Sequence, residues 1–193
     1  MMLSTKERIL DAAMGLLDAG GPGAVTLRAV GNAAGISQSA PYRHYQDKRA
    51  LLEAMVRANL DQMNAALTRA RLKATSPFEA LELVANQYFD FAMRFPVRYR
   101  FLFEVSREDS ALGVEARQAF EAVTGLVQAA QDAGELRIGD AAQIATLIFG
   151  AVFGMADLAQ FGLAAVPGRV GTGENLAPLL LNLLRRESGR NDS

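Results

Sequence analysis

GISQSAPYRHYQDKRALL, residues 35–52, holds the only histidine of the chain and sits between two ordinary apolar helical patterns. Gly35, Ile36 and Ser37 separate two short segments with helical apolar spacing, as in a helix-turn-helix. Glycine tolerates the positive φ that a tight turn needs, so we expect Gly35 to adopt it. Ile36 can then fold back onto the core, and Ser37 can cap the next helix. The stretch therefore predicts two short helices joined by a tight turn.

The second of these helices, expected at about residues 37–45, carries polar side chains that suit the major groove of DNA. Gln38 and Ser39 lie in its first turn, where side chains can reach base edges. Arg43 can donate two hydrogen bonds to guanine or bind a phosphate. The remaining candidates can donate to phosphate oxygens, and they are Tyr42, His44 and Lys48. Lys48 begins the following helix, whose free amides also favour a phosphate.

Several of these residues also have simpler explanations. A lone histidine such as His44 is often a surface or core residue, and Tyr45 is expected in the core because it ends the apolar face. Pro41 lies one place beyond the proline-tolerant first turn and removes a backbone hydrogen bond, which predicts a short or tightened helix. Turns of the Gly-apolar-Ser type also occur in plain helical bundles. The turn alone therefore leaves DNA binding open.

The flanking sequence predicts an all-α fold. Capping boxes at Ser4–Glu7 and Ser76–Glu79 begin two helices, and Pro96 should end the second of these near Arg94. Caps and apolar spacing together predict about nine helices. Their approximate ranges are 5–20, 26–34, 37–45, 47–73, 76–94, 97–105, 110–133, 140–163 and 175–187.

The composition argues against several kinds of site. The 193 residues include no cysteine and one histidine, which excludes disulfides and thiolate metal sites and supplies a histidine zinc site poorly. We find no nucleophile–histidine–acid set and no phosphate-binding glycine loop, so we predict no catalytic residue, metal or cofactor. The N-terminus has no long apolar core after its charges and does not resemble a signal peptide. We therefore expect a cytoplasmic protein that is not an enzyme.

Charge is distributed mildly unevenly. Residues 1–60 carry seven Lys and Arg against five Asp and Glu, while the whole chain has a net charge of −1. A nucleic-acid surface near the N-terminus is permitted by this balance but is not required by it. A helical ligand-binding or interaction protein without DNA binding therefore remains the alternative.

Residues 25–56, VTLRAVGNAAGISQSAPYRHYQDKRALLEAMV, resemble the DNA-binding domain of TetR-family transcriptional regulators. The resemblance extends from Thr5 to about Leu60. It includes the Thr before the second helix, the Ala-Gly-Ile-Ser turn, the Tyr-x-His-aromatic ending and the Lys before Ala-Leu-Leu. The resemblance implies that the matching residues face DNA, and these are Thr26, Arg28, Gln38, Ser39, Tyr42, His44 and Lys48.

The same resemblance implies the organisation of the whole chain. Residues 1–47 would form a three-helix helix-turn-helix domain, and residues 48–193 a helical regulatory and dimerisation domain. The protein would be a homodimeric repressor that binds double-stranded operator DNA and is released by a small molecule. One branch of the family has a Trp-x-x-x-His-Gly pattern where this chain has AVFGMADLAQFG at residues 151–162, with Phe153-Gly154 in place of His-Gly.

A ligand pocket is expected among the helices that follow residue 47. Its candidate lining is mainly apolar and aromatic, which suggests a hydrophobic or aromatic effector. Arg94 and Asp157 are the ionisable candidates, and for every candidate a plain place in the core is the alternative. The candidates are Met63, Tyr88, Phe91, Arg94, Phe103, Phe120, Thr124, Phe149, Phe153 and Asp157.

The helix expected at 140–163 is apolar on most of its sides and must be covered nearly all round. One face contains Leu147 and Leu158, and another contains Ala145, Val152 and Ala156. A partner subunit can cover the second face, with the last helix joining it in a four-helix interface. The uncharged run 141–156 is shorter than the roughly 20 residues of a membrane span, so we expect no membrane association.

Overall fold

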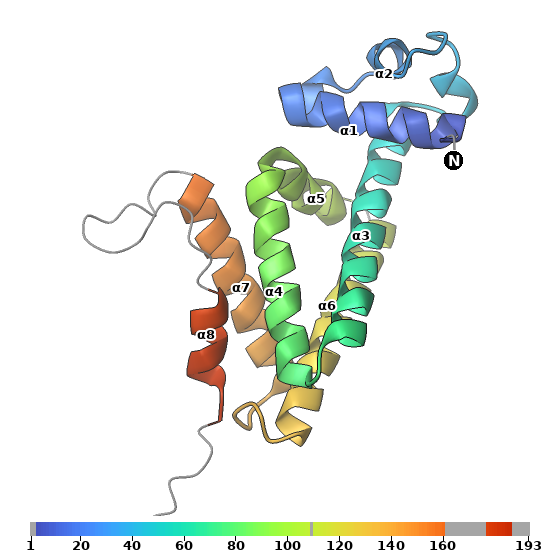
Figure 1. Cartoon of the computed structure of the whole chain (residues 1–193). Helices are drawn as coiled ribbons and strands as arrows, with labels where there is room; N and C mark the ends of the chain where they lie inside the picture. The colour runs from blue at the N-terminus through green and yellow to red at the C-terminus, as the bar shows by residue number, and fades with distance from the viewer. Residues whose placement is uncertain (1–2, 109, 161–176, 187–193) are drawn as a thin grey trace, which may run out of the picture. The chain divides into compact units, whose positions relative to one another are not determined.

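The computed structural model of the chain describes residues 3–108, 110–160 and 177–186. These ranges form eight α-helices, one 3-10 helix and no β-strand, so the all-α prediction is confirmed. The elements, shown in Figure 1, are α1 (Thr5–Ala24), α2 (Leu27–Ala33), η1 (Pro41–Arg43), α3 (Lys48–Lys73), α4 (Pro77–Arg94), α5 (Pro96–Glu108), α6 (Ser110–Asp132), α7 (Ala141–Gln160) and α8 (Ala177–Leu184).

The chain divides into two compact units. Unit 1 consists of Met1–Gln62 and Phe95–Ala116, and unit 2 consists of Met63–Arg94 and Arg117–Ser193. The long helix α3 passes from the first unit to the second between Gln62 and Met63. Unit 1 therefore combines the N-terminal helices with α5, a helix that follows α4 in the chain.

Helix α1 begins at the capping box that the sequence predicts. Ser4 Oγ accepts a hydrogen bond from the Glu7 amide at 3.2 Å, and the Glu7 carboxylate accepts one from the Ser4 amide at 2.7 Å. Hydrogen bonding of the Glu7 carboxylate to the backbone amide and the side chain of Ser4 holds the pKa of Glu7 below its ordinary value. Gly21, with φ +70° and ψ −173°, interrupts the helix before Pro22, and one further turn follows. The regular part of α1 thus ends close to residue 20, the end of the range predicted for this helix.

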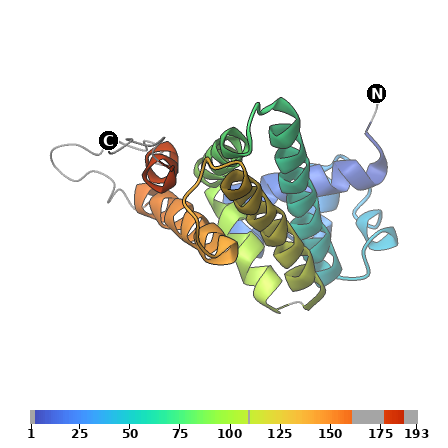
Figure 2. The same cartoon turned by 90° about the horizontal axis from the view of Figure 1, so that it is seen from below.

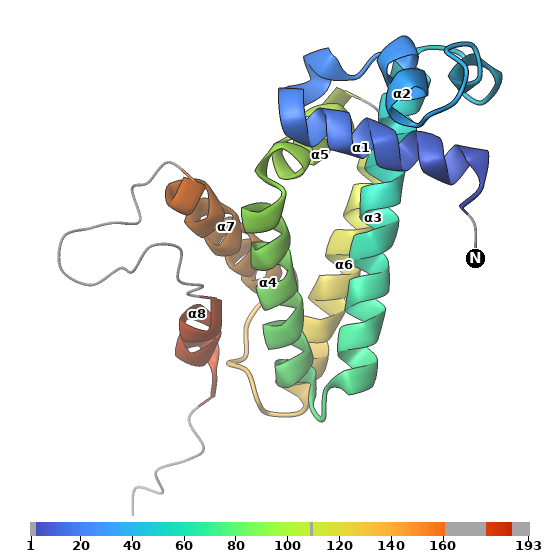
Figure 3. The ribbon, with the colours of Figure 1, turned by 45° about the horizontal axis from the view of Figure 1, so that its top comes forward.

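In unit 1, α1 packs against α2 and α5, as Figure 3 shows. Its buried face consists of Ile9, Ala13, Met14 and Leu17, which recur at the spacing of one helical side. The Asp47 carboxylate caps α3 by accepting a hydrogen bond from the Ala50 amide at 2.8 Å. The start of α3 is therefore set locally, within one residue of the predicted start at 47.

In unit 2, α4 packs against both α7 and α8 (Figures 1 and 2). Of the two hydrogen bonds in the capping box predicted at Ser76–Glu79, only one forms. Ser76 Oγ accepts from the Glu79 amide at 3.2 Å, but the Glu79 carboxylate accepts from the amide and hydroxyl of Thr75, both at 2.6 Å. Two donors on Thr75 outcompete the single Ser76 amide, and they lower the pKa of Glu79.

The end of α8 is tied to the loop between α6 and α7. The Arg137 amide donates to Leu184 O at 3.1 Å, and the Arg186 amide donates to Glu135 O at 3.0 Å. The Glu135 carboxylate in turn accepts from the Phe78 amide at the start of α4. These bonds fix the last described helix to both α4 and the loop.

Candidate DNA-binding segment and apolar cavity

The turn after α2 has the geometry that the sequence predicts. Gly35 has φ +64°, which confirms its expected left-handed conformation. Its amide donates to Asn32 O at 3.1 Å, and the Ile36 amide donates to Gly31 O at 3.0 Å. Together these two bonds form a Schellman motif, which ends the helix sharply.

Residues 37–45, which we call the recognition segment, form consecutive tight turns and no regular α-helix. The amides of Ala40, Arg43 and His44 donate to the carbonyls three residues earlier, and the 3-10 helix η1 occupies Pro41–Arg43. The predicted α-helix over 37–45 is therefore wrong in type, while the tightening predicted from Pro41 is confirmed. Pro41 has no amide hydrogen to give a regular helix, so its ring occupies the first turn of η1.

One side of the recognition segment is packed against α2. Ala40, Pro41 and Tyr45 are buried, and burial raises the pKa of the Tyr45 hydroxyl. The core position predicted for Tyr45 is confirmed. Gly31 permits close approach, because a Cβ there would lie 3.0 Å from Gln38 Cα. The opposite side of the segment is left for exposed polar side chains.

The structure leaves most of the eight candidate DNA contacts exposed. Thr26, Arg28, Gln38, Ser39, Tyr42, Arg43 and His44 are exposed, and Lys48 is half-buried. Three of them already have hydrogen-bond partners within the protein. Thr26 Oγ1 accepts from the Ala29 amide as the cap of α2, the Ser39 hydroxyl lies 3.2 Å from that of Ser37, and Lys48 Nζ donates to Pro22 O at 2.7 Å.

Two contacts of α1 involve residues that sequence reasoning missed. Arg8 Nη2 donates to Ala34 O at 2.6 Å. Asp18 forms a bidentate ion pair with Arg98 of α5, with Nε–Oδ1 and Nη2–Oδ2 distances of 2.9 and 2.6 Å. Local sequence carries no signal for either contact, because the partners are 26 and 80 residues apart in the chain.

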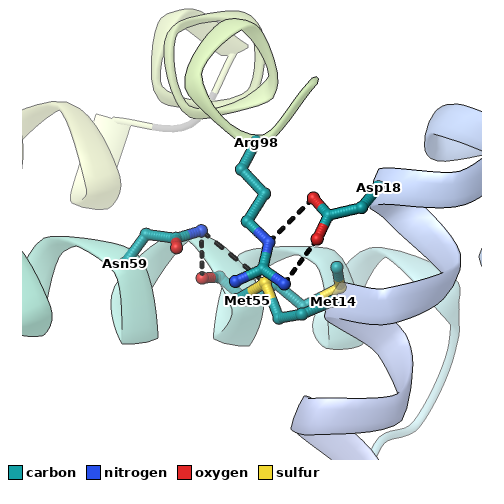
Figure 4. A network of polar contacts seen from close by, with 5 residues as sticks. All are labelled: Met14, Asp18, Met55, Asn59 and Arg98. Atoms are coloured by element: carbon teal, nitrogen blue, oxygen red, sulfur yellow. Dashed lines mark hydrogen bonds and ion pairs between the residues drawn. The ribbon is translucent and has the colours of Figure 1, made fainter. Parts of the chain in front are cut away.

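A buried asparagine lies beside this ion pair, as Figure 4 shows. Asn59 of α3 is fully buried, and its Nδ2 donates to Met55 O at 3.1 Å and lies 3.8 Å from Met14 Sδ. Its Oδ1 has no hydrogen-bond partner among the described residues. The region where α1, α3 and α5 meet therefore contains polar groups as well as apolar ones. Because buried polar groups need partners in defined places, they favour one packing arrangement of these helices.

Unit 2 contains a small apolar cavity with a volume of about 50 Å³. Four helices contribute its lining, and no charged side chain is among the lining residues. Tyr88 packs edge-on against Phe149 with 5.4 Å between ring centroids. The lining residues are Met63, Asn64 and Leu67 of α3, Leu81, Val84, Ala85 and Tyr88 of α4, Ala119 and Val123 of α6, and Ile148, Phe149 and Val152 of α7.

The structure places the ten pocket candidates at different sites. Met63, Tyr88 and Phe149 line the cavity, and the Phe120 ring lies 5.4 Å from that of Phe149. Thr124 donates its hydroxyl hydrogen to Phe120 O within α6. The side chain of Phe103 lies outside the described residues. Four more candidates are not among the lining residues, and they are Phe91, Arg94, Phe153 and Asp157.

Helices α7 and α8 each leave an apolar face uncovered. On α7, the face with Ala145, Val152 and Ala156 is buried, whereas Leu147 and Leu158 are 54% and 50% exposed. Gly150 and Gly154 on that helix have open space where a Cβ would stand. On α8 the exposed side chains are Leu179 and Leu183. The window 141–158 of α7 has a mean hydropathy of 1.6 and meets the length and composition of a membrane span.

Comparison with known families accounts for both parts of the chain. Residues 9–55 match the family described as bacterial regulatory proteins, tetR family, and residues 81–173 match the tetracyclin repressor-like C-terminal domain. The chain belongs to the TetR family. It is accordingly a DNA-binding transcriptional regulator with a helix-turn-helix, and the recognition segment is the second part of that motif. Regulation, rather than catalysis, is the activity of this family.

Solved structures of TetR regulators share the fold. SmeT, the repressor of the Stenotrophomonas maltophilia multidrug efflux pump SmeDEF, is 24% identical, with a TM-score of 0.72 over 96% of this chain and 92% of SmeT. PfmR from Thermus thermophilus is 20% identical, with a TM-score of 0.70 over 95% of this chain and all of PfmR (100%).

A protein of unknown function from Rhodococcus sp. RHA1 is also similar. It is 24% identical, with a TM-score of 0.81 over 95% of this chain and 94% of that protein. At these identities the likeness concerns the fold alone. A search of curated protein sequences gives no significant match.

Proposed function

We propose that this TetR-family regulator is a homodimeric repressor whose operator affinity falls when a small uncharged apolar molecule binds in the cavity of unit 2. The observation that carries the proposal is the cavity itself, which is apolar, lined by four helices and free of charged lining residues. A buried charge without a partner is strongly disfavoured, so an uncharged ligand suits this lining best.

The DNA-binding part of the proposal rests on the exposed side of the recognition segment. Residues 1–47 act as the DNA-binding domain and residues 48–193 as the regulatory domain. Gln38 and Ser39 contact base edges, since they are exposed polar residues in the first turn of the segment. The phosphate contacts come from the remaining candidates, which are Thr26, Arg28, Tyr42, Arg43, His44 and Lys48.

The size of the cavity suggests how binding is coupled to release. A cavity of about 50 Å³ is smaller than the roughly 150 Å³ cavity that admits benzene. A ligand of one aromatic ring must therefore displace some of the lining helices. Three of these, α3, α4 and α6, continue directly into unit 1 through Gln62, Phe95 and Ala116. A ligand that favours the opened cavity then shifts the regulator away from its DNA-binding state.

The uncovered faces of α7 and α8 support a homodimer. Leu147 and Leu158 flank Gly150 and Gly154 on one side of α7, and small residues let a second helix approach closely. The hydropathy of α7 alone would also suit a bilayer, but its opposite face packs on α4 within unit 2. A second copy of the chain is therefore the proposed cover, in a cytoplasmic protein that works on operator DNA.

Selection of bound DNA from a random pool tests the proposal. The expected result is one enriched sequence with two related half-sites, because a symmetric dimer reads both. Repetition with benzyl alcohol and with benzoate tests the effector chemistry. We expect the neutral alcohol to weaken binding more than the carboxylate. Enrichment of no sequence would contradict DNA binding, and release by benzoate alone would contradict an uncharged effector.

Replacement of Arg43 and Lys48 together by alanine is expected to weaken operator binding at all salt concentrations. Each lost phosphate contact should reduce the slope of log affinity against log salt by about one. Fluorescence anisotropy at several salt concentrations measures both quantities. The control is Arg69→Ala with Lys73→Ala, which removes the same charge from exposed positions of α3. Equal slopes for the two double variants would rule out these phosphate contacts.

Ala119→Leu is expected to weaken the response to the effector while preserving operator affinity. The larger side chain fills the cavity, so a ligand has to displace it, and we expect ligand affinity to fall by about tenfold or more. Calorimetric titration with the ligand found in the selection measures this loss. Ala65→Leu, at an exposed position of α3 away from the cavity, is the control. Retained release by Ala119→Leu would place the effector elsewhere.

A further inference from the structure

Arg8 connects α1 to the turn of the helix-turn-helix. Its Nη2 donates to Ala34 O at 2.6 Å and lies 3.4 Å from Gly35 O, across 26 and 27 residues of chain. Arg8 stands one residue before the family match begins at Ile9. Its side chain is otherwise exposed, so it contributes little to the core of unit 1.

The two carbonyls lie where α2 needs an additional donor. The Schellman motif occupies the carbonyls of Gly31 and Asn32, and the Ala34 amide occupies that of Val30. The carbonyls of Ala34 and Gly35 lie two and three residues beyond Asn32, at the negative end of the helix dipole. Helix α2 has no basic residue in its own last turn. The guanidinium of Arg8 supplies that positive charge from a different helix.

We propose that Arg8 is a positioning residue for DNA recognition, which holds the turn so that the recognition segment starts from a fixed place. The proposal rests on the DNA binding proposed above for that segment. Gln38 lies three residues beyond Gly35, and no regular helix stiffens the segment. Because the 3-10 turns give it little rigidity of their own, the direction of the segment depends on the turn before it.

A positioning role differs measurably from a direct phosphate contact. Loss of a phosphate contact weakens binding to every DNA sequence alike and reduces the salt slope by about one. If the turn after α2 is no longer held in one conformation, binding to the operator weakens more than binding to random DNA, because base contacts depend on the position of the recognition segment. It also exposes the amides of Gly35 and Ile36 to exchange, since their hydrogen bonds form the turn.

The experiment compares Arg8→Ala, Arg8→Lys and Lys6→Ala in the full-length protein. Lys6 lies on the same helix, is exposed and carries the same charge. Anisotropy with the selected operator and with a scrambled duplex gives the ratio of specific to non-specific binding. Hydrogen exchange of the peptide covering residues 31–45 gives the stability of the turn without DNA. Thermal unfolding checks that each variant folds.

We expect Arg8→Ala to lower the specific ratio by about tenfold, the cost of one base contact, and to speed exchange in the 31–45 peptide. Lys6→Ala should change neither quantity by more than about twofold, and Arg8→Lys should recover part of the loss because an ammonium can still donate to Ala34 O. If Arg8→Ala leaves the hydrogen exchange of the 31–45 peptide unchanged, the proposal is overturned. An equal loss of affinity for both duplexes, with a reduced salt slope, would overturn it in favour of a phosphate contact. If the wild-type protein selects no DNA, both this proposal and the proposed function fail.

Discussion

Leu147→Glu is expected to leave the protein monomeric and to lower its affinity for a two-half-site operator by about a thousandfold. Leu147 is 54% exposed and belongs to the uncovered face of α7. In a dimer this face would be buried, and a carboxylate there would have no partner. Each monomer would then bind one half-site alone, and linked binding of two sites gives an advantage of about 10²- to 10⁴-fold.

Sedimentation equilibrium measures the association state, and anisotropy with full and half operators measures affinity. The matched control is Ile138→Glu, because Ile138 is 85% exposed and precedes α7. It should remain dimeric and bind normally. The two variants should also bind a single half-site equally well. A dimeric Leu147→Glu protein would show that the interface lies on another surface.

The helices of this chain were predictable because their ends are determined by neighbouring residues. The cap at Ser4 and the proline at Pro96 act within one helical turn, and each sets a boundary that the structure reproduces. The exception is also local. Glu79 bonds to Thr75 in place of Ser76, because two nearby donors compete for one carboxylate. Sequence pattern identifies such competitors but does not rank them.

The candidate DNA-binding segment was predictable in its residues but not in its backbone. Pro41 indicated a tightened helix, yet the 3-10 form of residues 41–43 and the close approach of Gln38 to Gly31 of α2 were not predicted. The Arg8 contact was beyond reach for a different reason. A guanidinium has several rotatable bonds, and the carbonyls that it meets become neighbours only when α1 and α2 pack together.

The cavity shows the limit of residue type as a predictor. Aromatic side chains were favoured as its lining, but small aliphatic ones such as Val84 and Ala85 line it too. Which side of a buried helix faces a void depends on the neighbouring helices. Helix α7 is the informative case, since its two predicted apolar faces separate into a buried face and an open one.

Arg98→Ala is expected to lower the free energy of unfolding of unit 1 by about 2 kcal/mol, between the values typical of exposed and buried ion pairs. The pair is bidentate, and the side chains of Arg98 and Asp18 are only 16% and 31% exposed. Removal of the guanidinium leaves a partly buried carboxylate without its counter-charge. The Arg98 guanidinium also lies 4.4 Å from the centre of the Phe95 ring, a contact that is lost with it.

Urea denaturation followed by hydrogen exchange in α1 and α5 measures the loss within unit 1 separately from unit 2. Arg69→Ala, an exposed arginine of α3, should change stability by less than about 0.5 kcal/mol. The decisive comparison is a double-mutant cycle with Asp18→Ala, in which the second substitution should cost little once the first is made. Additive losses would show that each residue acts through its own packing and not through the pair.

If coupling is found, the same variants test regulation, because a weakened contact of α5 with α1 should let the effector release the operator at a lower concentration. If the variants show strong coupling but respond to the effector as the wild-type protein does, then Asp18 and Arg98 stabilise unit 1 and have no role in regulation.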